Sequence, residues 1–465
     1  MSSFYESHIY QTSNFVEEHF QLIFNKCSFI FNEISNITPI DIESTLISVA
    51  GCTITTAADL KNVGDICLVT DSSSKTTINA EVVSINNNQA ILLPFGSVAN
   101  LSNNTVVKKI SSSYEVNLGE FLLGAIVDGF GNILESCAED CAISSKKLIN
   151  CLAPDPLTRP IITKQLVTGV SAIDLFTSVG IGQRLAIFAA PGMGKTTLMG
   201  MILRNVEADI VVVGLIGERG REVREFLELE MNADARKKSV LVIATSDKSA
   251  VEQAKAPYVA QTIAEYFRDQ GKNVVLFIDS ITRYARAQRE IGFSSGEIAV
   301  RGGYPTSVFQ AFPKLIERAG NSTSGSITAF YTVLMENDTL SNDHIAEEIK
   351  SIVDGHIILS RKLAEQGHFP AINILSSLSR IANRIISNEH IMAIQKARML
   401  IAKYDELELL IRVGEYQKGY DKVADEAINK RDAINLIIQQ PVDTAIDFNN
   451  TLNRLITLME SRENC

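Results

Sequence analysis

The sequence predicts a three-part α/β protein: a small β-barrel, then a domain with a mainly parallel sheet, then a helical domain. Short β-rich runs broken by turn residues fill residues 44–110, a spacing typical of small barrels. Apolar runs typical of buried parallel strands alternate with helical stretches over residues 161–386. Residues 387–465 have a helical pattern. The 465 residues suffice for several domains with a large core.

Residues 1–43 are expected to form a helical segment. Apolar side chains between positions 14 and 34 fall on one helical face, with Asn14 as the N-cap and Glu17 at the reciprocal capping position. The simplest interpretation is a helix that docks on its own domain. A partner-binding or membrane-peripheral helix is the alternative, although Lys26 is its one lysine and attraction to anionic lipid is therefore not favoured.

The barrel is predicted from four runs and is followed by a connector. The connector, residues 111–160, contains the glycine-rich segment Gly124–Gly131 and a proline-rich stretch at 153–156. The expected barrel strands are Thr45–Val49, Asp65–Val69, Ile78–Ile85 and Ala90–Leu93.

The central domain is predicted from six apolar strands and one long helix. The helix should span Ser249–Gln270 and end at Gly271. In the C-terminal domain, one helical face carries Ile391, Ile394, Ala397, Leu400 and Ile401. The six strands are Leu185–Ala189, Ile210–Ile216, Val240–Thr245, Val274–Ile278, Ser326–Leu334 and His356–Leu359.

Composition excludes several classes of protein. The formal net charge is −11, whereas proteins that grip nucleic acid usually carry a basic surface. None of the seven cysteines forms a C-x-x-C pair, so we expect no zinc site. No apolar run reaches the length of about 18 residues that spans a bilayer, and the N-terminus lacks the order of a secretory signal. We therefore expect a cytoplasmic protein.

A phosphate-binding loop is the clearest chemical motif. It follows an apolar strand and precedes a helix, so that backbone N–H groups and the helix N-terminus face the phosphates. Lys195 should contact the β- and γ-phosphates, and the Thr196 hydroxyl should bind Mg²⁺. Ala189 replaces the first glycine of the usual pattern, which is tolerated only where φ is negative. The nucleotide-binding residues are Ala190, Pro191, Gly192, Met193, Gly194, Lys195, Thr196 and Thr197.

Two carboxylates follow other strands of the same sheet. Asp279 ends the strand Val274–Ile278, where it should hold the Mg²⁺ water shell beside the phosphate loop. Glu218 follows the strand Ile210–Ile216 and is the candidate for polarising the attacking water. Alternatively, Glu218 caps the next helix or pairs with a neighbouring arginine.

Several long motifs resemble the α/β family of rotary ATPases. The similarity is greatest to the type III secretion ATPases and their flagellar export relatives, and it extends from Gly124 to about Gly419. It implies a RecA-like P-loop NTPase domain that binds ATP with Mg²⁺. The motifs are the phosphate loop, Gly217–Phe226, Asp279–Ala285, Gly325–Val333, Pro370–Asn373 and Ser379–Arg380.

The resemblance also implies residue roles. Glu218 matches the catalytic glutamate and Arg219 the arginine beside it. Arg380 matches the position from which a neighbouring subunit supplies an arginine finger, with Arg361 and Arg384 as rival candidates. Two aromatic residues are expected at the base of the nucleotide: Phe369 stacks on adenine and Tyr416 closes the other side.

The implied function is that of the ATP-hydrolysing motor of a type III protein secretion system. Because one chain carries both the catalytic glutamate and the finger, identical chains can complete every site of a homohexameric ring. The resemblance implies contacts with a central stalk, peripheral stator or regulator proteins, chaperone–effector complexes and the export gate at the inner membrane. A docking surface for chaperone–effector complexes is expected around Lys403–Glu415.

Other functions in the same superfamily remain open. The alternatives are a flagellar-type export ATPase, an ion-translocating rotary ATPase subunit, a hexameric nucleic-acid translocase and a non-hydrolysing regulatory subunit. Residues 44–110 hold no basic–aromatic cluster, which disfavours nucleic-acid binding. The segment Val300–Pro305 is more similar to the virulence injectisome form than to the flagellar form.

Overall fold

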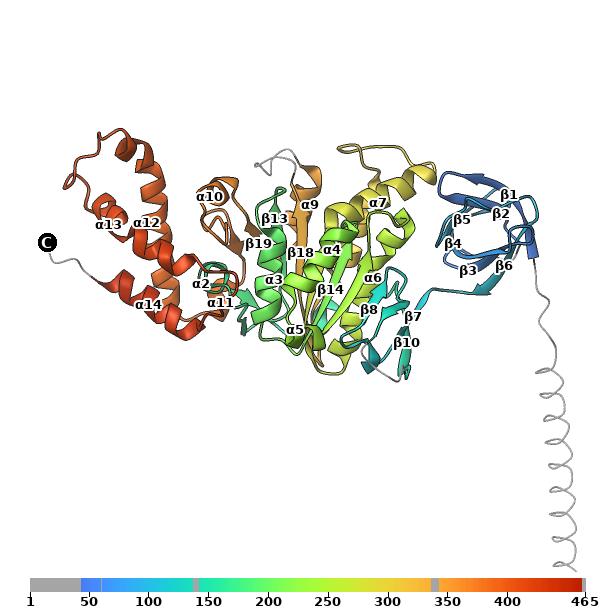
Figure 1. The fold of residues 1–465 in the computed structure, drawn as a ribbon, viewed down its shortest axis with the longest axis horizontal. Helices are drawn as coiled ribbons and strands as arrows, with labels where there is room; N and C mark the ends of the chain where they lie inside the picture. Colours follow the sequence, from blue (N-terminus) through green and yellow to red (C-terminus); the bar gives the residue numbers. More distant parts are fainter. Residues whose placement is uncertain (1–42, 60, 137–141, 336–342, 462–465) are drawn as a thin grey trace, which may run out of the picture.

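The computed structural model describes residues 43–59, 61–136, 142–335 and 343–461. The molecule is elongated, with a β-barrel at one end, a sheet domain in the centre and helices at the other end (Figure 1). The helix predicted between positions 14 and 34 lies outside the described residues.

Six antiparallel strands close the N-terminal barrel in the order β1-β2-β5-β4-β3-β6. The barrel core includes Ile54, Val69 and Leu92, which have no exposed surface. The four predicted runs overlap β1, β3, β4 and β5, and β2 and β6 complete the barrel. The strands are β1 (Glu43–Ala50), β2 (Thr53–Ala57), β3 (Ile66–Asp71), β4 (Thr76–Asn86), β5 (Gln89–Pro94) and β6 (Thr105–Ser111).

The central sheet has the order β20-β19-β13-β18-β16-β14-β15-β8-β9, and its six predicted strands are all present and mutually parallel. β20 and β9 run antiparallel at the two edges, and β17 (Gly320–Asn321) pairs with β18. The strands are β13 (Arg184–Ala189), β14 (Ile210–Ile216), β15 (Ser239–Ala244), β16 (Asn273–Asp279), β18 (Ser326–Leu334), β19 (Gly355–Ile358) and β20 (Leu378–Ser379).

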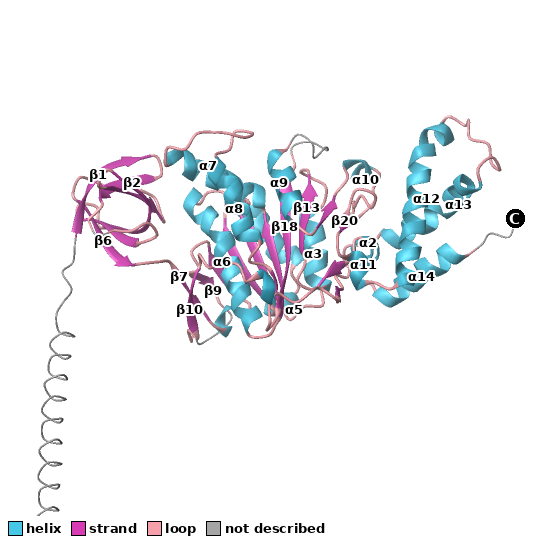
Figure 2. Ribbon diagram, turned by 180° about the vertical axis from the view of Figure 1, so that it is seen from behind, coloured by secondary structure: helices cyan, strands magenta, loops and turns pink. Residues whose placement is uncertain are grey.

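Helices cover both faces of this sheet, which explains why its strands are apolar throughout (Figure 2). Leu185 and Ile187 of β13 face the core that contains α3, whereas Ala186 and Phe188 face the core that contains α6 to α9. The helices are α2 (Ser171–Phe176), α3 (Lys195–Asn205), α4 (Gly220–Glu225), α5 (Ala233–Lys237), α6 (Ala250–Asp269), α7 (Ile281–Ser294), α8 (Thr306–Ile316), α9 (His344–Ile352), α10 (Arg361–Glu365) and α11 (Ala382–Ile385).

The ends of α6 follow from local chemistry. The Ser249 hydroxyl accepts a hydrogen bond from the Glu252 N–H, and Gly271 has a φ of 86° just beyond the last turn. The prediction of a helix closed by Gly271 is therefore confirmed.

The segment expected to be a connector, residues 111–160, also supplies one edge of the central sheet. Its strand β8 (Ile126–Asp128) runs parallel to β15, and β9 (Ile133–Glu135) pairs with β8. Three-residue strands are too short to produce a periodic pattern in the sequence, which explains why they were not predicted. The same segment contains the antiparallel pair β7 (Glu115–Leu118) and β10 (Ser145–Leu148), and a further short pair joins β11 (Gln165–Leu166) to β12 (Val179–Gly180).

Three helices form the C-terminal part: α12 (Asn388–Arg412), α13 (Lys422–Ile438) and α14 (Phe448–Glu460). The predicted apolar face of α12 is confirmed for Ile394, Ala397, Leu400 and Ile401, which are buried in the same core as α3, whereas Ile391 is half-buried. No helix in the described ranges is both long and apolar enough for a membrane crossing.

Candidate active site

The loop between β13 and α3 has the geometry of a phosphate-binding loop. Gly192 and Gly194 have φ angles of 82° and 81°, which residues with a side chain rarely adopt. Gly194 precedes α3 without a side-chain cap, so the first N–H groups of the helix remain for an anion. Ala189 is the last residue of an extended strand and does not have a positive φ. Alanine at this position therefore causes no strain.

Three predicted site residues meet at the carboxyl edge of the sheet. Asp279 ends β16, and Glu218 lies two residues beyond the end of the adjacent β14. The Lys195 ammonium contacts the Asp279 carboxylate directly and lies 3.6 Å from Glu218 Oε1. The Thr332 hydroxyl from β18 donates to Asp279 Oδ1 at 2.6 Å. Parallel strands thus place one cation between two carboxylates beside the phosphate loop.

Burial dominates the electrostatics of this cluster. Burial disfavours the charge on Lys195, but Asp279 and Glu218 outweigh it, and the pKa of Lys195 is raised. Burial, followed by the negative charge of Asp279, raises the pKa of Glu218 to about 7, while Lys195 offsets part of this effect. A carboxyl group with a pKa near neutrality is suited to general base catalysis.

Two buried polar atoms at the cluster have no hydrogen-bond partner among the described residues: Glu218 Oε1 and Arg283 Nε. Arg283 lies in the first turn of α7 and lowers the pKa of Glu218 through its charge. Gly217, which leads to Glu218, lies so close to Arg283 that a Cβ there would be 2.9 Å from the Arg283 Cβ. The sequence assigned Arg283 no role, although its position one helical turn after Asp279 was a usable signal.

The alternative roles for Glu218 do not match its contacts. Helix α4 has Arg219 as its N-cap residue, without a side-chain capping bond. Arg219 pairs with Glu222 at 3.5 Å, and Arg221 pairs with Glu225. Glu218 therefore faces Lys195, whereas the Arg219 side chain is 76% exposed.

A mostly apolar pocket of about 240 Å³ lies beside the phosphate loop. Phe369, which is 45% exposed, lines it. The Phe369 ring also comes within 4.0 Å of the place where a Cβ on Gly194 would lie. A flat aromatic base fits such a wall. The other lining residues are Met193, Gly194, Thr197, Leu198, Met201, Leu359, Pro370, Ala371 and Val442.

Tyr416 does not line this pocket. Its hydroxyl donates to Asp425 Oδ1 at 2.8 Å, and the backbone N–H of Gly419 donates to Asp425 Oδ2. These bonds fix Tyr416 within the loop between α12 and α13.

Arg380 lies at the amino ends of the parallel strands, whereas the phosphate loop lies at their carboxyl ends. It follows β20, whose Ser379 pairs with Gly355 at the amino end of β19, and its N–H donates to the Asp354 carbonyl at 3.0 Å. The phosphate loop leaves the carboxyl end of β13 at Ala189. Because β13 has six residues, Arg380 and the phosphate loop are separated by about 20 Å. The exposed Arg380 side chain therefore does not join the cluster of its own chain.

The fold and this cluster define a class of protein, the P-loop nucleoside triphosphatases. Comparison with protein families narrows the class. Residues 169–379 match the ATP synthase alpha/beta family, nucleotide-binding domain, and residues 386–457 match the T3SS EscN ATPase C-terminal domain.

Full-length relatives agree with these matches. The type 3 secretion system ATPase of Xanthomonas euvesicatoria is 46% identical, covering 90% of this chain and 93% of the relative. The SPI-2 type 3 secretion system ATPase of Salmonella typhimurium is 48% identical over 78% of this chain and 83% of its own. The flagellum-specific ATP synthase of Bacillus subtilis is 40% identical over 89% of this chain and 94% of its own.

Solved structures give the same result. The assembled ATPase EscN from the enteropathogenic E. coli type III secretion system has a TM-score of 0.85 and 44% identity, over 90% of this chain and all of that chain. EscN in complex with its central stalk EscO has a TM-score of 0.83 and 43% identity, with the same coverage. The chain therefore belongs to the type 3 secretion system ATPase family.

Proposed function

We propose that this chain hydrolyses ATP at sites shared between identical neighbours in a homohexameric ring, as the motor of a type III protein secretion system. The observation that carries the proposal is the separation of two sets of residues. Lys195, Glu218 and Asp279 lie together at the carboxyl ends of the parallel strands, and Arg380 lies exposed at their amino ends. In a closed ring, the Arg380 side of one copy lies against the phosphate-loop side of the next copy. EscN, at 44% identity, has been solved in an assembled form.

Each residue then has a defined task in hydrolysis. The glycine-rich loop and Lys195 hold the phosphates, and the Phe369 ring stacks on the adenine. The Glu218 carboxylate orients the attacking water and accepts its proton. Arg380 of a neighbouring copy stabilises the charge on the transferred phosphoryl group, with Arg219 beside Glu218 as an additional cation. Tyr416 is left out of the site because it does not line the pocket beside the phosphate loop.

Mg²⁺ is expected to enter with the nucleotide, held by the Thr196 hydroxyl and Asp279. The described residues contain no group of three His, Cys, Asp or Glu side chains suited to a metal ion, so phosphates and water must supply the remaining ligands. The buried Glu218 Oε1 and the exposed Thr196 fit such a site. When bound, the ion neutralises charge on the phosphate oxygens.

The proposed place of work is the cytosolic face of the inner-membrane base of the apparatus. There the ring would release chaperones from effector proteins and help to unfold them for the export gate. EscN forms a complex with the central stalk EscO, which supports a stalk partner here. Peripheral stator or regulator proteins would complete the assembly. The α12 segment Lys403–Glu415, with Leu409 70% exposed, is the proposed docking surface for chaperone–effector complexes.

Substitution of Glu218 by Gln tests the enzymatic proposal. The amide keeps the shape but cannot accept the proton, so we expect hydrolysis to fall by about 10²-fold or more while ATP binding persists. Glu228→Gln, at an exposed glutamate ten residues further along the chain that pairs with Arg224, is the matched control and should retain activity. Normal turnover by Glu218→Gln would refute the assignment.

A further inference from the structure

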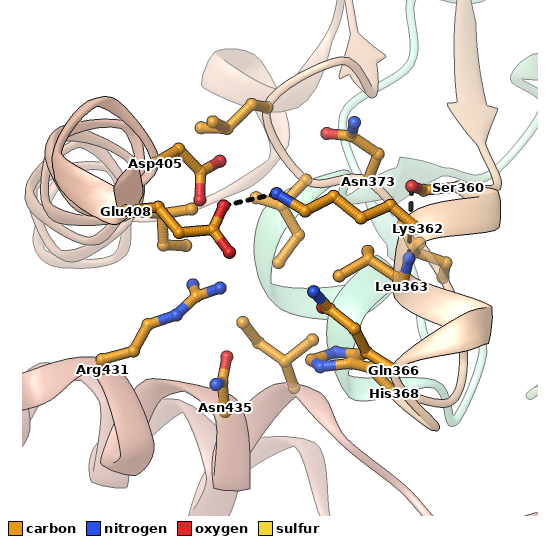
Figure 3. A pocket seen from close by; sticks show the side chains of 15 residues that line it. Ser360, Lys362, Leu363, Gln366, His368, Asn373, Asp405, Glu408, Arg431 and Asn435 are labelled. Atoms are coloured by element: carbon orange, nitrogen blue, oxygen red, sulfur yellow. Dashed lines mark hydrogen bonds and ion pairs between the residues drawn. The ribbon is translucent and has the colours of Figure 1, made fainter. Parts of the chain in front are cut away.

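A second cavity lies apart from the phosphate loop, between the sheet domain and the C-terminal helices. Its volume is about 100 Å³. Lys362 and His368 contribute from the sheet domain, Asp405 and Glu408 from α12, and Arg431 from α13 (Figure 3). Because its walls come from two parts of the fold, a molecule bound here would join them.

Two charged groups at this cavity make no ion pair in the described part of the chain. Asp405, exposed at the rim, makes no hydrogen bond or ion pair there. The Arg431 guanidinium lies 4.8 Å from the centre of the Tyr404 ring and has no carboxylate within ion-pair distance. Glu408, by contrast, is already paired with Lys362 at 2.6 Å and with Arg412 at 2.5 Å. The cavity therefore offers one cation and one anion that are not held in an ion pair, although the charge of Arg431 lowers the pKa of Glu408.

His368 adds a buried donor. The residue is 7% exposed, and its Nε2 has no hydrogen-bond partner among the described residues. Its Nδ1 lies 3.2 Å from the side-chain amide nitrogen of Gln439, which donates to it. Burial and the charge of Arg431 lower the pKa of His368, so the ring is neutral at pH 7. The ring proton then resides on Nε2, which is a donor without an acceptor.

We propose that this cavity binds a small zwitterion of the amino-acid type. Its carboxylate would accept hydrogen bonds from Arg431 and His368, and its ammonium group would face Asp405. An anion alone would leave Asp405 without a partner, and a cation alone would do the same to Arg431. Ile372, Ile401 and Ile438 form part of the apolar lining. The small volume restricts the ligand to a short side chain such as that of alanine.

Isothermal titration calorimetry of the full-length chain with L-alanine tests this proposal. We expect saturable binding with one ligand per chain. Asp405→Asn should weaken the affinity tenfold or more, because it removes the partner of the ammonium group. The matched control is Asp432→Asn, an exposed aspartate on α13 outside the cavity, which should bind like the wild type.

Acetate and ethylammonium, which each carry one of the two charges, should bind at least tenfold more weakly than L-alanine. The absence of saturable heat with L-alanine would overturn the proposal, as would unchanged binding by Asp405→Asn. Acetate or inorganic phosphate binding as tightly as L-alanine would assign the cavity to anions instead. The site does not depend on ATP hydrolysis, so Glu218→Gln should still bind L-alanine, which separates this test from that of the proposed function.

Discussion

Glu218 shows how burial prepares a single residue for catalysis. Its carboxylate faces Lys195 and Asp279 in a largely buried site, and burial raises its pKa to about 7. The glutamate and its partners were all expected from the sequence, since each directly follows an apolar strand or the phosphate loop. Arg283 was not expected, although it lies one helical turn after Asp279, because no local pattern shows that its charge acts on Glu218.

The raised pKa predicts a pH dependence of hydrolysis. Glu218 accepts a proton only when it is ionised, and a raised pKa keeps it protonated to higher pH than an ordinary glutamate. We expect kcat/KM to rise with pH through about 7 and to level off above it. Steady-state ATPase assays between pH 5.5 and 8.5 measure this. Glu228→Gln should show the same profile, and a wild-type profile flat across this range would contradict the assignment.

Phe369 provides a second prediction at the scale of one side chain. Loss of base stacking costs about 1–3 kcal/mol, so Phe369→Ala should weaken ATP binding by roughly 5- to 150-fold while kcat changes little. Titration of each variant with a fluorescent ATP analogue and steady-state kinetics give the two numbers. Phe293→Ala, an exposed phenylalanine outside this pocket, is the control. Equal affinities for Phe369→Ala and the wild type would exclude stacking.

At the scale of elements, long strands were predictable and short ones were not. β14 coincides with the predicted strand, because all seven of its residues are buried and apolar. β8 has only three residues, and its pairing with β15 joins positions more than 100 residues apart, which no local pattern encodes. The pocket around Phe369 was not predictable for the same reason, because Val442 and Met201 line it from distant parts of the chain.

One side chain links the barrel to the sheet domain. Lys255 of α6 is 8% exposed, pairs with Glu81 of β4 and lies 5.0 Å from the centre of the Phe95 ring. The same ammonium group lies 5.5 Å from the centre of the Tyr114 ring. An ion pair and two aromatic faces therefore connect the barrel to a helix that packs on β14 and β16.

Removal of this charge should loosen the barrel. Lys255→Met keeps the aliphatic packing but leaves Glu81 half-buried without its cation, at a cost of about 2 kcal/mol. Hydrogen–deuterium exchange should show faster opening of β4 and of the first turns of α6. Lys272→Met, at an exposed position after α6, should not change exchange there. Unchanged protection in Lys255→Met would mean that the contact does not hold the barrel.

At the scale of the whole molecule, the central claim is that one chain carries two half-sites: the phosphate-loop cluster at the carboxyl ends of the strands and Arg380 at their amino ends. Arg380→Ala should therefore leave the nucleotide affinity of the isolated chain unchanged, yet lower kcat of the assembled protein by about 10³-fold. Arg384→Ala, four residues further on, is the matched control and should remain active. A loss of nucleotide affinity in monomeric Arg380→Ala would place this arginine in its own site.

The most direct test measures ATPase activity per chain against protein concentration, with the mass of the species determined at each concentration. If neighbouring copies complete the site, activity per chain rises cooperatively, in step with a species of sixfold mass. Arg380→Ala should form the same species without the rise in activity. Full activity per chain at concentrations where only the monomer is present would contradict the account.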